Sequence, residues 1–234
     1  MLYFDANMRF LRARAGVSLS EYANLLALSP QTLQYYEEGH MEPQLSELLL
    51  LADRLALPVE VLLRHDLQGQ SDRVNRQDIR LVLLDVDGTL TDGGMYYTET
   101  GDQIKRFEVK DGIAIRRVAR RYSVSFGLIS SGTAEGLIRK RAEALDITRV
   151  FAGSGVKSHI VDGWLEEMGL TYAQLAYIGD DLNDLSVIEK AGLSACPADA
   201  VRQVKAAVDI VLKTKGGEGC VREFLEEVMG YDIE

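Results

Sequence analysis

Cysteine and long apolar runs are scarce in this sequence. Only Cys196 and Cys220 occur among 234 residues, too few and too unpatterned for a disulfide framework or a zinc cluster. No apolar run approaches the roughly 18 residues that a membrane-spanning helix needs. The first residues, which include Asp5, have a helical pattern rather than that of an export signal. We therefore expect a cytoplasmic protein with no membrane partner.

Positive charge is also scarce, above all in the first third of the chain. The sequence has 26 Lys and Arg against 36 Asp and Glu, a net charge of −10, and its first lysine is Lys105. Residues 1–72 contain five arginines against ten acids, which gives that segment a net charge of −5. Such a chain does not attract polyanions through its overall field, although a local basic patch still could.

The remaining composition is that of a folded protein, and its pattern changes along the chain. Hydrophobic residues make up 47% and charged residues 26%, which argues against wholesale disorder. Apolar residues first recur at helical spacing, with Ser29-Pro30 as a helix start and Gly39 as a helix end. We predict an all-α domain of five short helices over residues 1–66, and a linker without apolar periodicity over residues 67–78.

After residue 78, strand and helix patterns alternate. Asp111 is interpreted as the N-cap of the first long helix in this region. Strands separated by helices of this length imply right-handed βαβ units. The fold class predicted for residues 79–234 is therefore α/β with a mainly parallel sheet. The predicted strands, followed by the two strands of a hairpin, are Leu81–Val86, Val124–Ile129, Arg149–Phe151, Leu175–Ile178, Leu193–Ala195, and Met95–Thr98 with Ile104–Val109.

Two aspartates follow the first of these strands directly. Four apolar residues, Leu81–Leu84, lead to Asp85 and Asp87, and Gly88 then lets the chain turn away. Open α/β sheets bind their ligands at the carboxyl ends of strands. Two neighbouring carboxylates are costly unless a cation or a shared proton compensates them. By itself the pair is better explained as an acidic surface turn, so other residues must decide.

Two further strands also end in polar side chains. Ser130 ends the second strand, Asp180, Asp181 and Asp184 follow the strand Leu175–Ile178, and Lys157 lies at a helix start between them. Carboxylates for a divalent metal, a hydroxyl and an ammonium group thus meet at one edge of the predicted sheet. Lys157 could instead be a solvated helix residue, and Asp181 and Asp184 could be helix caps or groups that orient other ligands.

The chain resembles the haloacid dehalogenase phosphatase superfamily. The four motifs of that superfamily correspond here, over roughly residues 79–230, to Asp85-Val86-Asp87-Gly88-Thr89, Ser130, Lys157 and Gly179-Asp180-Asp181-Leu182-Asn183-Asp184. The resemblance implies a Rossmann-like core in which Asp85 attacks phosphorus and Asp87 acts as acid and base. It implies that Ser130 and Lys157 hold the phosphoryl oxygens. It also implies Mg²⁺ held by Asp85, the backbone carbonyl of Asp87, and Asp180.

Within that superfamily, the closest resemblance is to the 3-deoxy-D-manno-octulosonate 8-phosphate phosphatases. Short intervals between the motifs leave only a hairpin at residues 94–109 in place of a cap domain. Related capless phosphatases assemble into tetramers, so the resemblance implies a homotetramer. The segments that carry the resemblance to this family are Lys110-Asp111-Gly112-Ile113, Tyr177–Leu182, Ala191–Ser194, Ala198–Ala200 and Gly216–Glu223.

Three positions depart from the pattern of that family. Ser131-Gly132 stands where the family has Gly-Arg, and Lys110 and Glu218 each replace an Arg. Lys110, Ser131 and Gly132 are the candidate substrate-binding residues. Because Arg and Lys are not equivalent at bidentate sites, the loss of three arginines that meet an anionic sugar acid indicates a different substrate.

Residues 1–66 resemble the helix-turn-helix domain of the Cro and lambda-repressor family. The resemblance implies DNA contacts from Gln31, Thr32 and Gln34 on the recognition helix. Leu19 replaces the usual glutamine, and no basic residue accompanies these side chains, so a module for protein contacts is an equal alternative. The segments that carry the resemblance are Gly16-Val17-Ser18, Ala23, Ser29–Leu33, Tyr36–Gly39, and Pro43 before Leu45–Leu48.

Two functions from different classes fit these patterns. The first is a Mg²⁺-dependent phosphatase that acts on a small phosphorylated sugar or related metabolite and carries a repressor-like module. The second is a DNA-binding transcriptional regulator whose phosphatase-like domain senses a phosphorylated ligand. The intact set of Asp85, Asp87, Lys157 and Asp180 favours catalysis.

Overall fold

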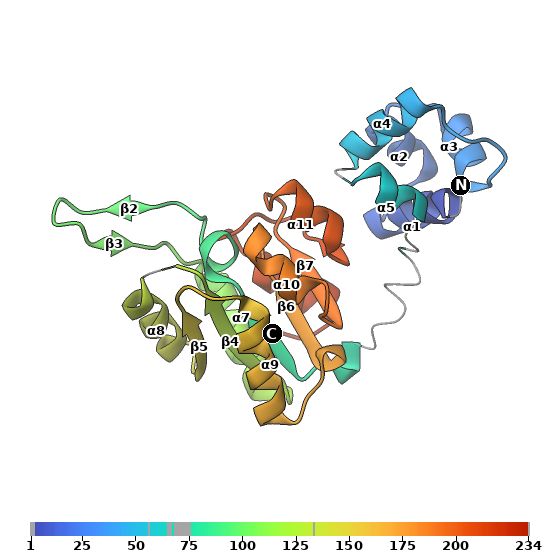
Figure 1. The fold of residues 1–234 in the computed structure, drawn as a ribbon. Coiled ribbons are helices and arrows are strands. Elements are labelled where there is room, and N and C mark those ends of the chain that lie inside the picture. Colours follow the sequence, from blue (N-terminus) through green and yellow to red (C-terminus); the bar gives the residue numbers. More distant parts are fainter. Residues whose placement is uncertain (1–2, 56, 65–66, 68–75, 133, 234) are drawn as a thin grey trace. The chain divides into compact units, whose positions relative to one another are not determined.

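The computed structural model describes residues 3–55, 57–64, 67, 76–132 and 134–233 (Figure 1). Contacts between Cα atoms divide the chain into two compact units, Met1–Arg73 and Val74–Glu234. This division falls inside the predicted linker, most of which, residues 68–75, lies outside the described residues. The predicted domain boundaries therefore stay predictions. Within the described ranges, no helix combines the length and apolar character that crossing a bilayer requires.

The described part of the N-terminal unit is helical, and its helix starts follow from local side chains. Ser18 and Glu21 form a reciprocal capping box at the start of the second helix. The Ser29 hydroxyl accepts the N–H of Thr32, and Pro30 occupies the first helical position, as predicted. The helices are α1 (Phe4–Ala15), α2 (Leu19–Leu25), α3 (Pro30–Glu37), α4 (Leu45–Arg54) and α5 (Val59–Arg64).

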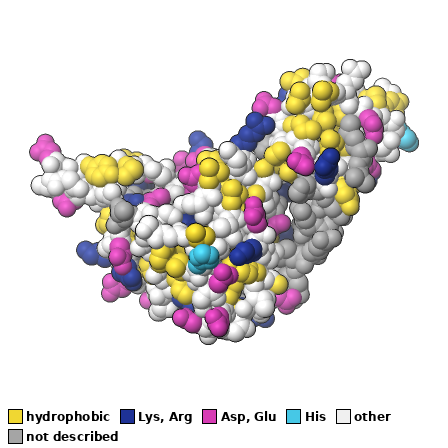
Figure 2. All heavy atoms as spheres, viewed as in Figure 1, with side chains coloured by type: hydrophobic (Ala, Val, Ile, Leu, Met, Phe, Trp, Pro, Cys, Tyr) yellow, Lys and Arg dark blue, Asp and Glu magenta, His cyan; other side chains and the backbone are white. Residues whose placement is uncertain are grey.

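A small apolar core joins these helices. Phe4, Leu33, Tyr36 and Leu51 are among its buried members, and the rings of Phe4 and Tyr36 meet edge to face with centroids 5.5 Å apart. The outer face of α4 is also apolar, because Leu45, Leu49 and Leu50 are exposed on it. Hydrophobic side chains are visible on the face of this unit seen in Figure 2.

The C-terminal unit is built on a six-stranded parallel sheet, in the order β5-β4-β1-β6-β7-β8. The mainly parallel α/β fold predicted from the sequence is confirmed. Its strands are β1 (Leu81–Leu84), β4 (Ser125–Ser130), β5 (Arg149–Ala152), β6 (Leu175–Ile178), β7 (Leu193–Cys196) and β8 (Ile210–Val211). Its helices are α7 (Val109–Arg121), α8 (Glu135–Ala144), α9 (Lys157–Met168), α10 (Leu185–Ile188), α11 (Arg202–Ala207) and α12 (Cys220–Glu223).

Helices cover both faces of this sheet. Alternate side chains of β1 point to opposite faces, so Val82 and Leu84 pack in one apolar cluster with α7, α8 and α12. Leu81 and Leu83 pack in the other cluster with α9, α10 and α11. The four consecutive apolar residues of β1 are explained by this burial on both sides.

The hairpin is an arm of two short strands, β2 (Tyr96–Tyr97) and β3 (Gln103–Ile104), which projects from the sheet unit (Figure 1). The pairing places Tyr96 opposite Ile104 and Tyr97 opposite Gln103. These strands are shorter than predicted. The chain between them turns back through Thr98, whose N–H bonds the carbonyl of Asp102.

Two other predicted details were wrong, and one strand was missed. The strand β1 ends at Leu84 rather than Val86, because the chain turns at once through Val86–Leu90, with Gly88 at φ +92°. Asp111 is not a helix cap. The Glu108 carboxylate accepts the N–H of Lys110 and starts α7 earlier, which leaves Asp111 buried within the first turn. The two-residue strand β8 was not predicted at all.

Candidate active site

The central strands of the sheet bring the predicted acidic and hydroxyl groups to one edge. Strand β1 lies between β4 and β6. Asp85 follows β1, Ser130 is the last residue of β4, and Asp180 lies two residues after β6. Since the three strands are parallel, their carboxyl ends share this edge. Lys157, the first residue of α9, reaches the same place.

Lys157 lies at the centre of a buried network of charges. Its Nζ lies 2.5 Å from Asp85 Oδ1 and 2.6 Å from Asp184 Oδ1. The Tyr177 hydroxyl, 2.5 Å from the same Asp184 oxygen, completes the network. The Lys157 side chain has no exposed surface. Burial opposes its charge, but the carboxylates of Asp85 and Asp184 prevail and raise the pKa of Lys157, so the ammonium stays protonated.

Three carboxylates at this edge are close enough to share a cation. One oxygen each from Asp85, Asp180 and Asp184 lie within 4.8 Å of one another. Burial, followed by the neighbouring Asp184 charge, raises the pKa of Asp180 to about 7. Burial also raises the pKa of Asp85 well above its ordinary value, although Lys157 opposes this shift. A divalent cation would relieve this repulsion, and carboxylate oxygens are the donors that Mg²⁺ prefers.

Asp184 is the least suited of the three to bind a metal ion directly, because both of its oxygens are already engaged. Oδ1 takes hydrogen bonds from Lys157 and Tyr177. Oδ2 accepts the backbone N–H groups of Asp180 at 2.9 Å and Asp181 at 3.1 Å. Asp184 therefore holds the loop that carries Asp180, and Asp181 caps the following turn through the N–H of Leu182.

Asp87 lies between a hydroxyl and a second lysine. Ser130 Oγ donates to Asp87 Oδ2 at 3.4 Å, and Lys105 Nζ contacts Asp87 Oδ1. The N–H of Gly132 donates to Ser130 Oγ at 2.9 Å. A side chain at Gly132 would place its Cβ 2.7 Å from Asp87 Oδ2. The glycine therefore leaves room for the carboxylate of Asp87.

Two other glycines make room for the acidic groups. A Cβ on Gly88 would lie 2.1 Å from Asp180 Oδ2, and one on Gly179 would lie 2.4 Å from Asp184 Cγ. Both distances are shorter than carbon atoms tolerate without movement. Gly88 also has φ +92°, a conformation that glycine adopts readily. These positions explain why glycine follows Asp87 and precedes Asp180.

The other predicted substrate-binding residues lie at the rim of this site or beyond it. Ser131 is exposed and accepts a hydrogen bond from Asn183 Nδ2 at 2.9 Å, which links the loops after β4 and β6. Lys110 is exposed in the first turn of α7. Two further members of the site, Lys105 and the Tyr177 hydroxyl, were not predicted from the sequence, and the role of Asp184 was left open.

The candidate DNA-binding side chains engage neighbours on α3 or at its two caps. Gln31 Nε2 lies 3.0 Å from the Tyr35 hydroxyl, and Gln34 Nε2 lies 2.7 Å from Glu38 Oε1. The Thr32 hydroxyl lies 2.7 Å from that of Ser29. Glu38 adds negative charge to the exposed face of α3, which disfavours an approaching phosphate backbone.

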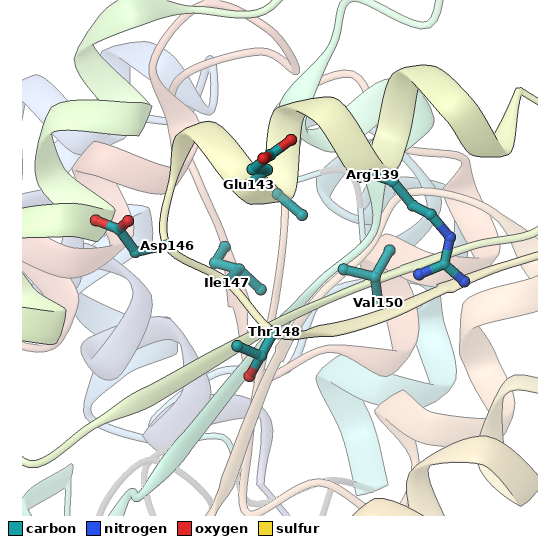
Figure 3. Close-up of a pocket in the computed structure, with 7 residues that line it drawn as sticks. Arg139, Glu143, Asp146, Ile147, Thr148 and Val150 are labelled. Atoms are coloured by element: carbon teal, nitrogen blue, oxygen red, sulfur yellow. The ribbon is translucent and has the colours of Figure 1, made fainter.

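A cavity of about 430 Å³ lies between α8 and the amino-terminal part of β5, away from the carboxyl ends of the strands (Figure 3). It contains none of the predicted site residues. Figure 3 shows Arg139 and Glu143 on α8 and Val150 on β5 around it. Its lining is completed by Ala142, Asp146, Ile147 and Thr148.

Comparison with known proteins identifies both units. A family model described as haloacid dehalogenase-like hydrolase matches residues 137–225, and a helix-turn-helix model matches residues 8–62. The chain is 38% identical over 147 residues to the 3-deoxy-D-manno-octulosonate 8-phosphate phosphatase KdsC of Escherichia coli K12, covering 63% of this chain and 77% of that protein. It is 37% identical over 153 residues to KdsC of Haemophilus influenzae, covering 65% and 84%.

Solved structures agree with these relatives. The 3-deoxy-D-manno-octulosonate 8-phosphate phosphatase of Yersinia pestis matches with a TM-score of 0.64 and 34% identity, over 68% of this chain and 85% of that one. The enzyme of Moraxella catarrhalis, solved with a magnesium ion, a phosphate ion and KDO, matches with a TM-score of 0.65 and 28% identity, over 70% and 91%. The chain therefore belongs to the haloacid dehalogenase-like hydrolase family, as a phosphoric monoester hydrolase that also carries an N-terminal helix-turn-helix region.

Proposed function

We propose that this protein is a Mg²⁺-dependent phosphatase that hydrolyses a small phosphorylated sugar or related metabolite through an aspartyl-phosphate intermediate. The observation that carries the proposal is the pairing of Asp85 with Lys157, with Asp87 near Ser130. Lys157 neutralises a carboxylate that would otherwise repel the phosphate ester. Asp85 and Asp87 then have separate roles.

In the first half of the reaction, a carboxylate oxygen of Asp85 attacks phosphorus. The bond from phosphorus to the ester oxygen breaks, and Asp87 gives its proton to that departing oxygen. Ser130 and Lys157 hold the phosphoryl oxygens during the transfer. In the second half, Asp87 takes a proton from water as the water oxygen attacks phosphorus, which releases inorganic phosphate and regenerates the Asp85 carboxylate.

Asp85, Asp180 and the backbone carbonyl of Asp87 are the groups that we expect to hold Mg²⁺. The cluster of carboxylates and the clearance at Gly88 fit such an ion. When bound, it would neutralise charge on the phosphoryl group and on the carboxylates. Asp184, which already accepts hydrogen bonds on both oxygens, would orient the loop of Asp180 rather than bind the ion.

The substrate is proposed to be a small phosphorylated compound other than the sugar acid named for the relatives. The glycine at position 132 supports this, because it has no charged side chain where the family has an arginine, and Lys105 contacts the other oxygen of Asp87. Glu218, which is exposed, presents an acid rather than a base. A panel of sugar phosphates with and without a carboxylate tests the idea, and a clear preference for the sugar acid would contradict it.

The decisive test of the phosphatase proposal compares the wild type with Asp85→Asn on a chromogenic phosphate ester. We expect Mg²⁺-dependent turnover by the wild type that EDTA abolishes and excess Mg²⁺ restores. The asparagine has a similar shape but is a poor nucleophile, so turnover should fall by at least about 1000-fold, the order of loss seen when a group essential to catalysis is removed. Equal turnover in both proteins, or none in either, would overturn the proposal.

The proposed assembly is a homo-oligomer, with a tetramer expected from the family. The exposed apolar side chains of the arm support this, since Met95, Tyr96, Tyr97 and Ile104 are all about half exposed or more. Sedimentation velocity of the wild type and of Tyr97→Ser tests it, because a monomeric wild type would contradict the proposal. The cytoplasmic location stays a prediction.

A regulatory role in DNA binding is the alternative, supported by the helix-turn-helix match. Gln31, Thr32 and Gln34 would be the residues that contact DNA. Low-salt gel shifts with genomic fragments, comparing the wild type with Gln31→Ala and Gln34→Ala, test it. Failure of the wild type to retard any fragment would favour a module for protein contacts.

A further inference from the structure

We propose that Lys105 is a positioning residue that orients Asp87 for proton transfer. This inference rests on the proposed phosphatase function. Lys105 Nζ contacts Asp87 Oδ1, and the lysine side chain is only 10% exposed, whereas the Asp87 side chain is 35% exposed. A lysine side chain that is largely shielded from solvent and reaches a half-buried carboxylate differs from the usual solvated lysine.

The arm determines where Lys105 lies. Lys105 directly follows β3, in which Ile104 pairs with Tyr96. Beyond Lys105, Phe107 bridges to Thr91, and the Thr91 N–H donates to the carbonyl of Val86. Lys105 is therefore held between two pairings, one within the arm and one to the turn that contains Asp87. The ammonium reaches the carboxylate from a segment 18 positions away in the sequence.

The two oxygens of Asp87 have different surroundings. Oδ1 contacts Lys105, and Oδ2 lies 3.4 Å from the Ser130 hydroxyl, which is the side where we place the phosphoryl group. With Oδ1 fixed, the carboxyl group cannot rotate freely, and Oδ2 is the oxygen that faces the departing ester oxygen. General acids act only when held within hydrogen-bond reach of the atom that receives the proton.

Lys105 also favours the state that follows proton transfer. When Asp87 gives its proton to the departing oxygen, it becomes a carboxylate beside the Lys105 ammonium, and the ion pair stabilises the new charge. Lys105 itself neither gains nor loses a proton in this step. Lys157 pairs with the nucleophile Asp85, so each of the two aspartates has a lysine of its own.

Leaving-group dependence distinguishes this role from simple phosphate binding. The Lys105→Met variant keeps the length of the side chain but removes its charge. We expect kcat/KM, which reports the step in which the ester oxygen departs, to fall about 10- to 100-fold for alkyl phosphates. This is less than the roughly 100- to 10,000-fold contribution of a general acid, because Asp87 itself remains. For 2,4-dinitrophenyl phosphate, whose departing oxygen needs no proton, we expect a change of less than about threefold.

The controls separate an effect on Asp87 from damage to the arm. Lys105→Arg should recover part of the activity on alkyl phosphates, because it keeps a cation at the same place. Arg106→Met removes the same charge from the adjacent position, whose side chain is 55% exposed. We expect it to leave kcat/KM for both esters unchanged. If kcat/KM fell equally for both esters in Lys105→Met, Lys105 would act in phosphate binding or in folding. If kcat/KM for alkyl phosphates were unchanged, Lys105 would have no part in catalysis. Either result overturns the inference.

The same assays separate failure of this inference from failure of the proposed function. An inactive wild type contradicts the phosphatase proposal itself, and this inference falls with it. An active wild type that loses turnover on all esters in Asp85→Asn upholds that proposal. The ratio of the alkyl and dinitrophenyl rates in Lys105→Met then decides this inference alone.

Discussion

In the N-terminal unit, arginines hold helices together, whereas in the C-terminal unit lysines hold carboxylates at the ends of strands. Arg12 binds both carboxylate oxygens of Glu37 at 2.7 and 2.8 Å, and Arg9 contacts the Glu37 carbonyl. Arg54 contacts the carbonyl of Leu26. These contacts join α1 to α3 and α4 to the end of α2, so the arginines serve the fold of the unit.

The two lysines of the site, Lys157 and Lys105, are largely shielded from solvent, which costs folding energy. Lys157 is fully buried between Asp85 and Asp184, and burial of charges is expensive even when they are paired. A protein with a net charge of −10 can accept a phosphate dianion only where local cations outweigh its overall field. Cations committed to helix contacts therefore leave little for a phosphate backbone, whereas Lys157 and Lys105 prepare a site for one phosphoryl group.

The largest expected effect comes from removing a cation in each unit. In Lys157→Met, the carboxylates of Asp85 and Asp184 stay buried without their cation, which should lower the free energy of unfolding by about 3–5 kcal/mol. Turnover should also fall at least about 100-fold. Arg12→Met should cost about 1–2 kcal/mol, because the Arg12 side chain is 29% exposed, and should leave turnover unchanged.

Trp164, the single tryptophan, lies in α9 and monitors only the C-terminal unit. We therefore expect Lys157→Met to shift the urea transition seen by Trp164 fluorescence. We expect Arg12→Met to shift only the urea transition of the far-ultraviolet circular dichroism signal that comes from the N-terminal unit. A shift of the Trp164 transition by Arg12→Met would contradict the expectation that Arg12 stabilises the N-terminal unit alone, since it would mean that the two units unfold together.

A second pair of variants compares two glycines with positive φ. Gly88→Ala places a methyl group 2.1 Å from Asp180 Oδ2, at φ +92°. We expect a loss of about 1–3 kcal/mol from backbone strain and a loss of turnover of about 100-fold, because the carboxylate must move. Gly16 has φ +66° at the end of α1, and among the described residues beyond its chain neighbours no atom lies within 4 Å of an added Cβ.

Gly16→Ala should therefore cost only the strain of the left-handed conformation, about 1–2 kcal/mol, with full turnover. Phosphatase assays and urea unfolding of both variants measure the two effects. If Gly88→Ala kept wild-type turnover, the clearance between Gly88 and Asp180 would have no catalytic value.

The sequence predicted the site residues that follow the strands of the sheet better than those that reach the site from other segments. Asp85, Ser130 and Asp180 follow apolar runs, and parallel strands must bring their carboxyl ends together. Lys105 follows a strand of only two residues, and its contact with Asp87 depends on how the arm closes in three dimensions. No local pattern distinguishes such a lysine from a solvated one.

The details that the sequence did not predict have similar local causes. The pattern correctly predicts a buried strand that contains Tyr177, but it does not reveal that the Tyr177 hydroxyl bonds Asp184. Glu108 and Asp111 are both suitable caps, and the structure uses the earlier one. Strand β8 contains only two residues, too few to show a periodicity.

The smallest expected effect concerns Asp111, which the cap prediction misplaced. Its carboxylate accepts the N–H of Arg222 at 2.8 Å, while among the described residues its Oδ2 atom meets no hydrogen-bond partner. Burial raises the pKa of Asp111 from 3.8 to about 6. The folded protein therefore binds this proton more tightly than the unfolded chain does. The stability that Asp111 contributes falls as pH rises from about 4 to about 6, and it stays at the lower level above that range.

Asp111→Asn should remove this pH dependence, because the amide stays neutral while its oxygen can still accept the Arg222 N–H. We expect the variant to be more stable than the wild type by about 1–2 kcal/mol at pH 8, less than the full linkage energy because the new amide N–H groups also lack an acceptor. The advantage should shrink toward pH 5, where the wild-type carboxyl becomes protonated. Urea unfolding followed by Trp164 fluorescence between pH 5 and pH 8 measures the difference, and taking it between the two proteins cancels the titration of Asp85 and Asp180. A difference that stays constant across this range would show that Asp111 does not become charged at the cost of stability, and the buried charges described for the C-terminal unit would then lie at the strand ends.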